Sequence, residues 1–401
     1  MEEQDILQLI SIYHRRLANV SLKFKRFLHN EINWDARLIG IMGARGVGKT
    51  TLLLQHIKET HKNIDEAIWI SLDNMLLKTH DLQAVVEYLY VHGYTYMYFD
   101  EVHKYKDWTN HLKNFYDNYP DLKIVYTGSS MLEIDNSKVD LSRRQSLYTL
   151  PVMSFREYLE YIGTLSVAPI TFEDLTQNHV SISMDITART KILKHFSDYI
   201  NFGCYPFFKE AGRDFHTQLS AIAQLVIDTD VPSVMDISYS SIEKIKKLLM
   251  IIAKNVPFEP NISKLCASLD TTRDNCLRML YMLDRANILS LLTKELKNYK
   301  HLISPEKVYL NNSNLMIALT SNPDIGNLRE TFFMNQLKSK FELQMPKKGD
   351  FLINGKYLFE IGGQYKGFDQ IKDLPNSFLA IDGLETGVAN RIPLWIFGML
   401  Y

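Results

Sequence analysis

An apolar run at 38–42 leads directly into Gly43-Ala44-Arg45-Gly46-Val47-Gly48-Lys49-Thr50-Thr51. A glycine followed by four residues and then Gly-Lys-Thr is typical of a loop that wraps a polyphosphate. Glycines allow the chain to turn through positive φ, and a helix that begins at Lys49 directs its N–H groups at the anion. We expect residues 43–51 to bind a nucleotide, with Lys49 on the β/γ-phosphates and the Thr50 hydroxyl on Mg²⁺.

Short apolar segments alternate with helical patterns after this loop, which indicates a parallel α/β domain. Strands that are buried on both faces are short and almost wholly apolar. The predicted strands lie at 38–42, 67–72, 96–99, 124–127 and 146–151, and the predicted helices at 49–60, 82–91 and 108–118. Residues 1–33 carry apolar positions at helical spacing, which predicts one or two helices packed on this domain.

Two acids, Asp100 and Glu101, follow the apolar strand at 96–99. Ligands bind at the carboxyl ends of strands in open α/β sheets. We expect Asp100 to hold the Mg²⁺ shell and Glu101 to act as the base that polarises the attacking water. Read alone, the pair also suits a helix N-cap beside a surface acid.

Polar residues at 127–130 (Thr-Gly-Ser-Ser) end the next strand, and a basic pair follows at 143–144. Ser129 is predicted to sense the γ-phosphate, although a Gly/Ser turn that caps a helix fits the same residues. Arg143 is predicted to donate to the γ-phosphate, in its own subunit or a neighbour's. The alternative for the basic pair is a solvated loop.

Residues 241–300 carry three helical patterns followed by a strand pattern, as in a winged helix. The segment holds 11 Lys and Arg against 6 Asp and Glu, a local charge of +5 in a chain whose net charge is −1. The third helix carries Arg273, Asn275 and Arg278, where a recognition helix would read duplex DNA. Winged helices also bind proteins, so both partner classes stay open.

Residues 301–401 predict a small α/β region with a strand at 307–310, a helix at 329–340 and a hairpin over 349–361. Glu330, Asp350 and Glu360 occupy the positions at which a restriction-type nuclease holds Mg²⁺. Such a site also needs a lysine two residues after the last acid, where this chain has Gly362; the nearest lysine downstream is Lys366.

The composition excludes several classes of protein. The chain of 401 residues is 46% hydrophobic and 23% charged, as in ordinary soluble proteins of two or three domains. Three cysteines without metal-ligand spacing, an acidic start and no long apolar run predict a cytoplasmic protein without a signal peptide or membrane span. A homo-oligomer or a protein partner is compatible with this composition.

The chain resembles the prokaryotic AAA-like ATPases that couple a P-loop domain to a C-terminal domain of unknown function. The resemblance rests on segments 40–51, 98–108, 127–130 and 141–158, and covers nearly the whole chain. It implies ATP as the nucleotide, an additional-strand P-loop sheet with a catalytic glutamate, a winged helix and a restriction-endonuclease-like C-terminal fold. We divide the chain into an N-terminal helical segment (1–33), a P-loop AAA-like domain (34–165), a helical connector (166–240), a winged-helix-like module (241–300) and a nuclease-like α/β domain (301–401).

Three functions follow from these patterns. The first is an ATPase whose Mg²⁺-dependent hydrolysis drives or switches the attached domains. The second is a nucleotide-switched DNA-binding or defence-type regulator with little turnover. The third, an ATP-driven nuclease, ranks last because Gly362 replaces the expected lysine.

Overall fold

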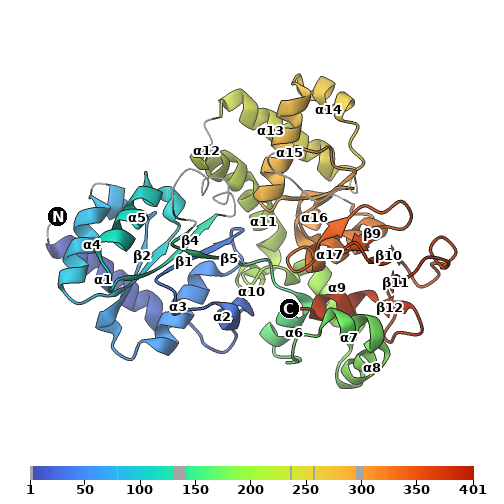
Figure 1. Ribbon diagram of the computed structural model, residues 1–401, viewed down its shortest axis with the longest axis horizontal. Coiled ribbons are helices and arrows are strands. Elements are labelled where there is room, and N and C mark those ends of the chain that lie inside the picture. The colour runs from blue at the N-terminus through green and yellow to red at the C-terminus, as the bar shows by residue number, and fades with distance from the viewer. Residues whose placement is uncertain are drawn as a thin grey trace. The chain divides into compact units, whose positions relative to one another are not determined.

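Five parallel strands form the sheet of the first unit, in the order β2-β3-β4-β1-β5 (Figure 1). The computed structural model describes residues 3–78, 80–129, 141, 143–234, 237–255, 258–294, 302–320 and 322–401. This unit comprises residues 1–151 and 229–236. Its strands are β1 (Leu38–Gly43), β2 (Ala67–Ser71), β3 (Tyr96–Asp100), β4 (Lys123–Ser129) and β5 (Ser146–Thr149). The additional strand β4 lies between β1 and β3, so the loop after β1 and the acids after β3 meet at one edge of the sheet.

Helices flank this sheet in Figure 1. They are α1 (Glu3–Asn19), α2 (Leu28–Glu31), α3 (Lys49–Thr60), α4 (Leu82–Val91), α5 (Trp108–Asn118) and the short α12 (Val231–Val234). Helix α1 packs against α3 and β2 through buried Ile6, Leu9 and Tyr13. The predicted helical segment at 1–33 is therefore one long helix and, after an irregular stretch, a single turn at α2.

The second unit comprises residues 152–228 and 237–401 and begins with a largely helical region. Its helices are α6 (Phe155–Tyr161), α7 (Phe172–Gln177), α8 (His179–Arg189), α9 (Ile192–Asp198), α10 (Phe208–Ala211) and α11 (Phe215–Leu225). Phe155, Phe196, Tyr199 and Phe332 contact one another as buried aromatic rings, which gives this unit its own core.

Three further helices precede a two-stranded antiparallel sheet. They are α13 (Tyr239–Ala253), α14 (Ile262–Leu269) and α15 (Arg273–Arg285), followed by β6 (Leu289–Leu292) and β7 (Lys307–Leu310). Helix α15 begins at the cap residue Thr272, whose side chain accepts from the Asn275 amide, and buries Leu277, Leu280 and Leu283. The apolar spacing that predicted the three helices is thus the buried side of each helix.

A mixed sheet ends the chain, in the order β12-β11-β10-β9-β8. Two helices, α16 (Ser313–Leu319) and α17 (Ile325–Leu337), precede this sheet. Its strands are β8 (Leu343–Gln344), β9 (Phe351–Ile353), β10 (Tyr357–Gly362), β11 (Ser377–Ile381) and β12 (Arg391–Pro393). Strands β10, β11 and β12 are parallel, whereas β9 joins β10 in the antiparallel hairpin that the sequence predicted. Helix α17 begins at Ile325, four residues before the predicted start, because Asp324 caps it there. Among the described residues, no helix is long and apolar enough to cross a membrane.

Candidate functional site

The loop between β1 and α3 has the backbone of a phosphate cradle. Gly46 and Gly48 take positive φ values of 80° and 100°, a region that side chains with a Cβ rarely adopt. Gly48 is the N-cap of α3, so the helix starts directly behind the turn. Arg26 braces the loop, because its guanidinium donates to the Val47 carbonyl and to the Pro151 carbonyl. The loop thus has glycines at positive φ directly before the amino end of a 12-residue helix, which is the backbone pattern of anion-binding loops.

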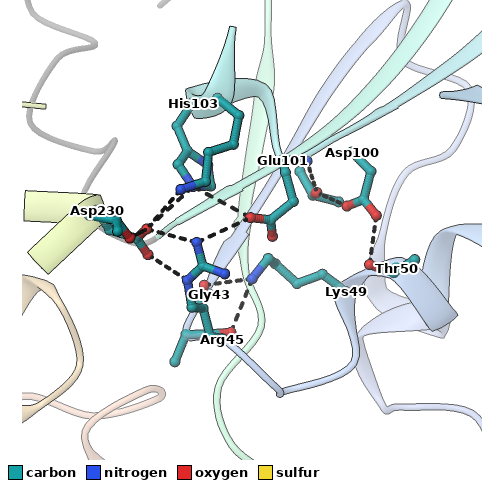
Figure 2. A network of polar contacts seen from close by, with 12 residues as sticks. Gly43, Arg45, Lys49, Thr50, Asp100, Glu101, His103 and Asp230 are labelled. Carbon is teal, nitrogen blue, oxygen red and sulfur yellow. Dashed lines mark hydrogen bonds and ion pairs between the residues drawn. The ribbon is translucent and has the colours of Figure 1, made fainter. Parts of the chain in front are cut away.

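Lys49 lies buried beneath this loop, with 5% of its surface exposed. Its Nζ donates to the Gly43 carbonyl at 2.8 Å and to the Ala44 carbonyl at 3.0 Å (Figure 2). Burial lowers the pKa of Lys49 below its ordinary value, and the nearby carboxylates of Glu101 and Asp100 oppose that shift. The Lys49 ammonium thus donates to two backbone carbonyls of the loop.

Asp100 and Thr50 are in direct contact. The Thr50 hydroxyl donates to Asp100 Oδ2 at 2.6 Å, and the Thr127 hydroxyl donates to Asp100 Oδ1. Burial raises the pKa of Asp100, while the hydrogen bonds from Thr127 and Thr50 act in the opposite direction. A hydroxyl and a carboxylate oxygen beside a phosphate cradle are the donor set that Mg²⁺ takes in P-loop proteins, so these residues fit that ion.

Glu101 turns away from the strand. Its backbone is left-handed (φ 57°, ψ 45°), and its amide donates to the Thr127 hydroxyl at 3.1 Å. The carboxylate Oε2 lies 3.4 Å from His103 Nε2 and 3.7 Å from Arg45 Nη2. Adjacent acids in sequence therefore face different partners: Asp100 faces Thr50, and Glu101 faces Arg45.

Asp230 completes this network from a distant part of the chain (Figure 2). Its carboxylate is fully buried and receives Arg45 Nε at 2.9 Å and Arg45 Nη2 at 2.8 Å. Burial alone would raise the pKa of Asp230, but the facing donor groups of His103 and Arg45 outweigh it and hold that pKa well below its ordinary value. Sequence analysis missed Asp230, because it follows Arg45 by 185 positions with no local pattern around it.

Two other predicted site residues, Ser129 and Arg143, lie on β4 and in the turn before β5. Ser129 is buried at the carboxyl end of β4, where it is paired with Gly43 of β1. Arg143 is exposed in the turn before β5, and its neighbour Arg144 forms an ion pair with Asp117. The predicted position Ser130 is outside the described residues.

The acids of the C-terminal region are matched with lysines. Glu330 Oε2 accepts from Tyr309 at 2.7 Å and lies 3.2 Å from Lys307 Nζ, which is also 3.7 Å from Asp350 Oδ1. Burial raises the pKa of Glu330, and the Asp350 charge adds to the rise. Within the described part of the chain, no group of three or more His, Cys, Asp or Glu side chains is arranged to hold a metal ion.

Lys366, four residues after Gly362, provides the lysine that pairs with Glu360. Its Nζ lies 2.6 Å from Glu360 Oε1, and its stem crosses Gly362 so closely that a Cβ there would lie 2.5 Å from the Lys366 Cβ. The missing side chain at 362 is therefore what makes room for a lysine that comes from four residues further along.

Comparison with known proteins agrees with the first unit's geometry. Residues 35–159 match the model of an AAA domain, and residues 193–325 match a domain of unknown function (DUF8612). The part of the chain that matches the AAA domain contains all five strands of the parallel sheet.

An uncharacterized protein of Methanocaldococcus jannaschii is 25% identical over 280 residues, which are 67% of this chain and 58% of the relative. The aligned region thus spans little more than half of that relative's length. AMPPCP-bound DnaA from Aquifex aeolicus is 14% identical, with 71% of this chain and 89% of that one covered at a TM-score of 0.26. The S. cerevisiae Hsp104-ADP complex is 12% identical, with 62% and 36% covered at a TM-score of 0.26. Likenesses this remote do not extend to function.

Proposed function

We propose that this protein binds ATP at residues 43–51 and hydrolyses it with Mg²⁺, and that hydrolysis drives or switches the second unit. One observation carries the proposal: the Thr50 hydroxyl and the Asp100 carboxylate meet at 2.6 Å directly behind the phosphate cradle. These oxygens come from different elements, α3 and the end of β3, so the sheet order is what brings them together.

Each residue then has a separate task. Lys49 would exchange its carbonyl partners for the β- and γ-phosphates, and Thr50 and Asp100 would hold Mg²⁺. Bound Mg²⁺ supplies charge that offsets the γ-phosphate oxygens. Glu101 would accept a proton from the attacking water and orient it in line with the γ-phosphate. Ser129 would contact the γ-phosphate from β4.

The test is phosphate release from ATP together with equilibrium binding of ATP. Glu101→Gln should bind ATP like the parent and lose turnover by about 100-fold or more, because a positioned base contributes at least that much. Lys49→Ala should lose ATP binding, because its ammonium would no longer contact the β- and γ-phosphates. The matched control is Glu87→Gln on the exposed face of α4, which should turn over at the parent rate.

If Glu101→Gln hydrolyses ATP at the parent rate, Glu101 is not the base. If the parent protein neither binds nor hydrolyses ATP, the whole proposal fails. Loss of turnover in Arg143→Ala, restored on mixing with Glu101→Gln subunits, would assign Arg143 to a neighbour's site.

A nucleotide-switched DNA-binding role is the second candidate, and one observation favours it. Arg273, Asn275 and Arg278 are all exposed on α15, the third helix of the winged-helix-like segment. Other basic residues there are held within the unit: Lys244 and Lys247 donate to the carbonyls of Asp270 and Ser268. The exposed face of α15 therefore offers two arginines and an asparagine to a partner.

Duplex DNA binding is measured against salt, with and without ATP. Binding through this face should weaken steeply with salt. The double variant Arg273→Ala, Arg278→Ala should make the slope of log affinity against log salt concentration shallower, by the equivalent of about two phosphate contacts. Absent or salt-insensitive binding would point instead to a protein partner, in which case the winged-helix-like segment is a protein-binding module.

A further inference from the structure

Asp230 is a buried carboxylate held against the phosphate loop by three basic side chains. Arg45 bonds it in two places, Lys104 Nζ lies 3.5 Å from Oδ1, and His103 Nε2 lies 3.7 Å from the same oxygen (Figure 2). Neither ring nitrogen of His103 has a hydrogen-bond partner among the described residues, so Arg45 makes the best-formed contact.

Arg45 lies between two carboxylates. Its Nη2 is 2.8 Å from Asp230 Oδ1 and 3.7 Å from Glu101 Oε2. A guanidinium is a rigid planar fork, and two parallel N–H bonds to one carboxylate are its strongest arrangement. Asp230 has this arrangement, and Glu101 has only a loose ion pair.

Removal of the Asp230 charge would change that balance. The guanidinium cannot lose its proton and needs a partner in a partly buried place, and Glu101 is the carboxylate already beside it. A carboxylate that is tightly paired with arginine is a weaker base and is no longer free to reach a water molecule. Asp230 and Glu101 are therefore alternative partners of the same guanidinium, that of Arg45.

We propose that Asp230 is a positioning residue that keeps Arg45 off Glu101, so that Glu101 stays available as the base. This inference rests on the proposed ATPase function. Asp230 touches no reacting atom in this scheme and acts only through Arg45.

The position of Asp230 in the chain adds a consequence. Residues 229–236 belong to the first unit, while the chain on both sides of them, 152–228 and 237–401, forms the second. Asp230 is the last residue of η7 (Val226–Asp230) and precedes α12, which packs against η3 (Val102–Lys104) beside Glu101. In this proposal, a carboxylate on a segment inserted between two stretches of the second unit thus determines which partner Arg45 of the loop at 43–51 takes.

The test compares kcat and KM for ATP in the full chain for four variants: Asp230→Asn, Arg45→Gln, the double variant and Asp228→Asn. Asp230→Asn should lower kcat by about 10-fold or more and change KM by less than about 3-fold, since the loss is of base function rather than binding. In the Arg45→Gln background, Asp230→Asn should have no further effect on kcat. Asp228→Asn, an exposed acid paired with Lys246, should behave as the parent.

An equal loss of kcat from Asp230→Asn in both backgrounds would overturn the proposal, because Asp230 would then act on the fold or through His103. A rise in KM with kcat unchanged would overturn it as well. Should Asp230→Asn alone fail to fold, the comparison of the double variant with Arg45→Gln still decides, since the double variant has no unpaired arginine. Absence of turnover in the parent would instead refute the ATPase proposal itself, which separates the two failures.

Discussion

Thr127 is the residue on which both acids of the site depend. Its hydroxyl donates to Asp100 Oδ1 and accepts from the Glu101 amide at 3.1 Å, and the residue is fully buried. Thr127→Val keeps the shape and removes both hydrogen bonds. Each buried group left without a partner costs about 1–3 kcal/mol, and Asp100 retains its second donor, Thr50. The expected loss in the free energy of unfolding is about 3 kcal/mol.

Urea denaturation followed by tryptophan fluorescence measures this loss, because Trp34, Trp69 and Trp108 lie in the first unit. Thr127→Ser is the control: it keeps the hydroxyl and loses one methyl group, at about 1 kcal/mol. Turnover of ATP should fall in Thr127→Val and persist in Thr127→Ser, since the left-handed backbone of Glu101 is held by the same hydroxyl. A valine variant within about 0.5 kcal/mol of the parent, or a serine variant as unstable as the valine one, would refute this reasoning.

Two further predictions concern stability. Burial and the charges of neighbouring histidines lower the pKa of His56 to about 3, so the unfolded chain takes up this proton near pH 6.5 while the folded chain does not. Stability is therefore lost as pH falls below 6.5, and acidification from pH 7 to 5 should lower the free energy of unfolding by about 2 kcal/mol. Urea titrations at the two pH values should find a smaller loss in His56→Phe. The control His92→Phe, at an exposed histidine, should lose as much as the parent. Lys366→Met leaves the buried Glu360 carboxylate without its ion pair and should destabilise the second unit by about 1–3 kcal/mol in the same assay. Lys372→Met, which breaks only an exposed pair, should not, and equal effects of the two would contradict the role given to Lys366.

Local patterns predicted the first unit closely. The strands at β1, β2 and β3, and the helices α3, α4 and α5, lie within one or two residues of the predicted ranges. Each is recognised by nearest-neighbour information: an apolar run for a doubly buried strand, 3.6-residue spacing for a helix, and glycines where φ must be positive. The loop at 43–51 needs only such information, because its positive-φ glycines and the start of α3 are close together in the chain.

The sequence also predicted that Thr50 and Asp100 act together as Mg²⁺ ligands, and the structure brings the two side chains into contact at the start of α3 and the end of β3. Between β4 and β5 the predictions on Ser129 and Arg143 stay predictions. The hydroxyl that contacts both acids belongs to Thr127. Thr127 and Ser129 are two residues apart and so lie on the same face of β4, and the register with β3, in which Phe99 pairs with Tyr126, brings Thr127 beside Asp100.

By itself, then, the sequence determined the glycine-rich loop at 43–51, the positions of the two acids and the strands beside them, because each is defined by residues close together in the chain. Only the tertiary structure decided the partners of those residues. Asp230 reaches Arg45 across 185 positions, and Lys366 crosses Gly362 to reach Glu360. A single carboxylate or lysine forms no periodic pattern from which such a role could be predicted. Its partner depends on how the chain folds back in three dimensions, which local sequence does not specify.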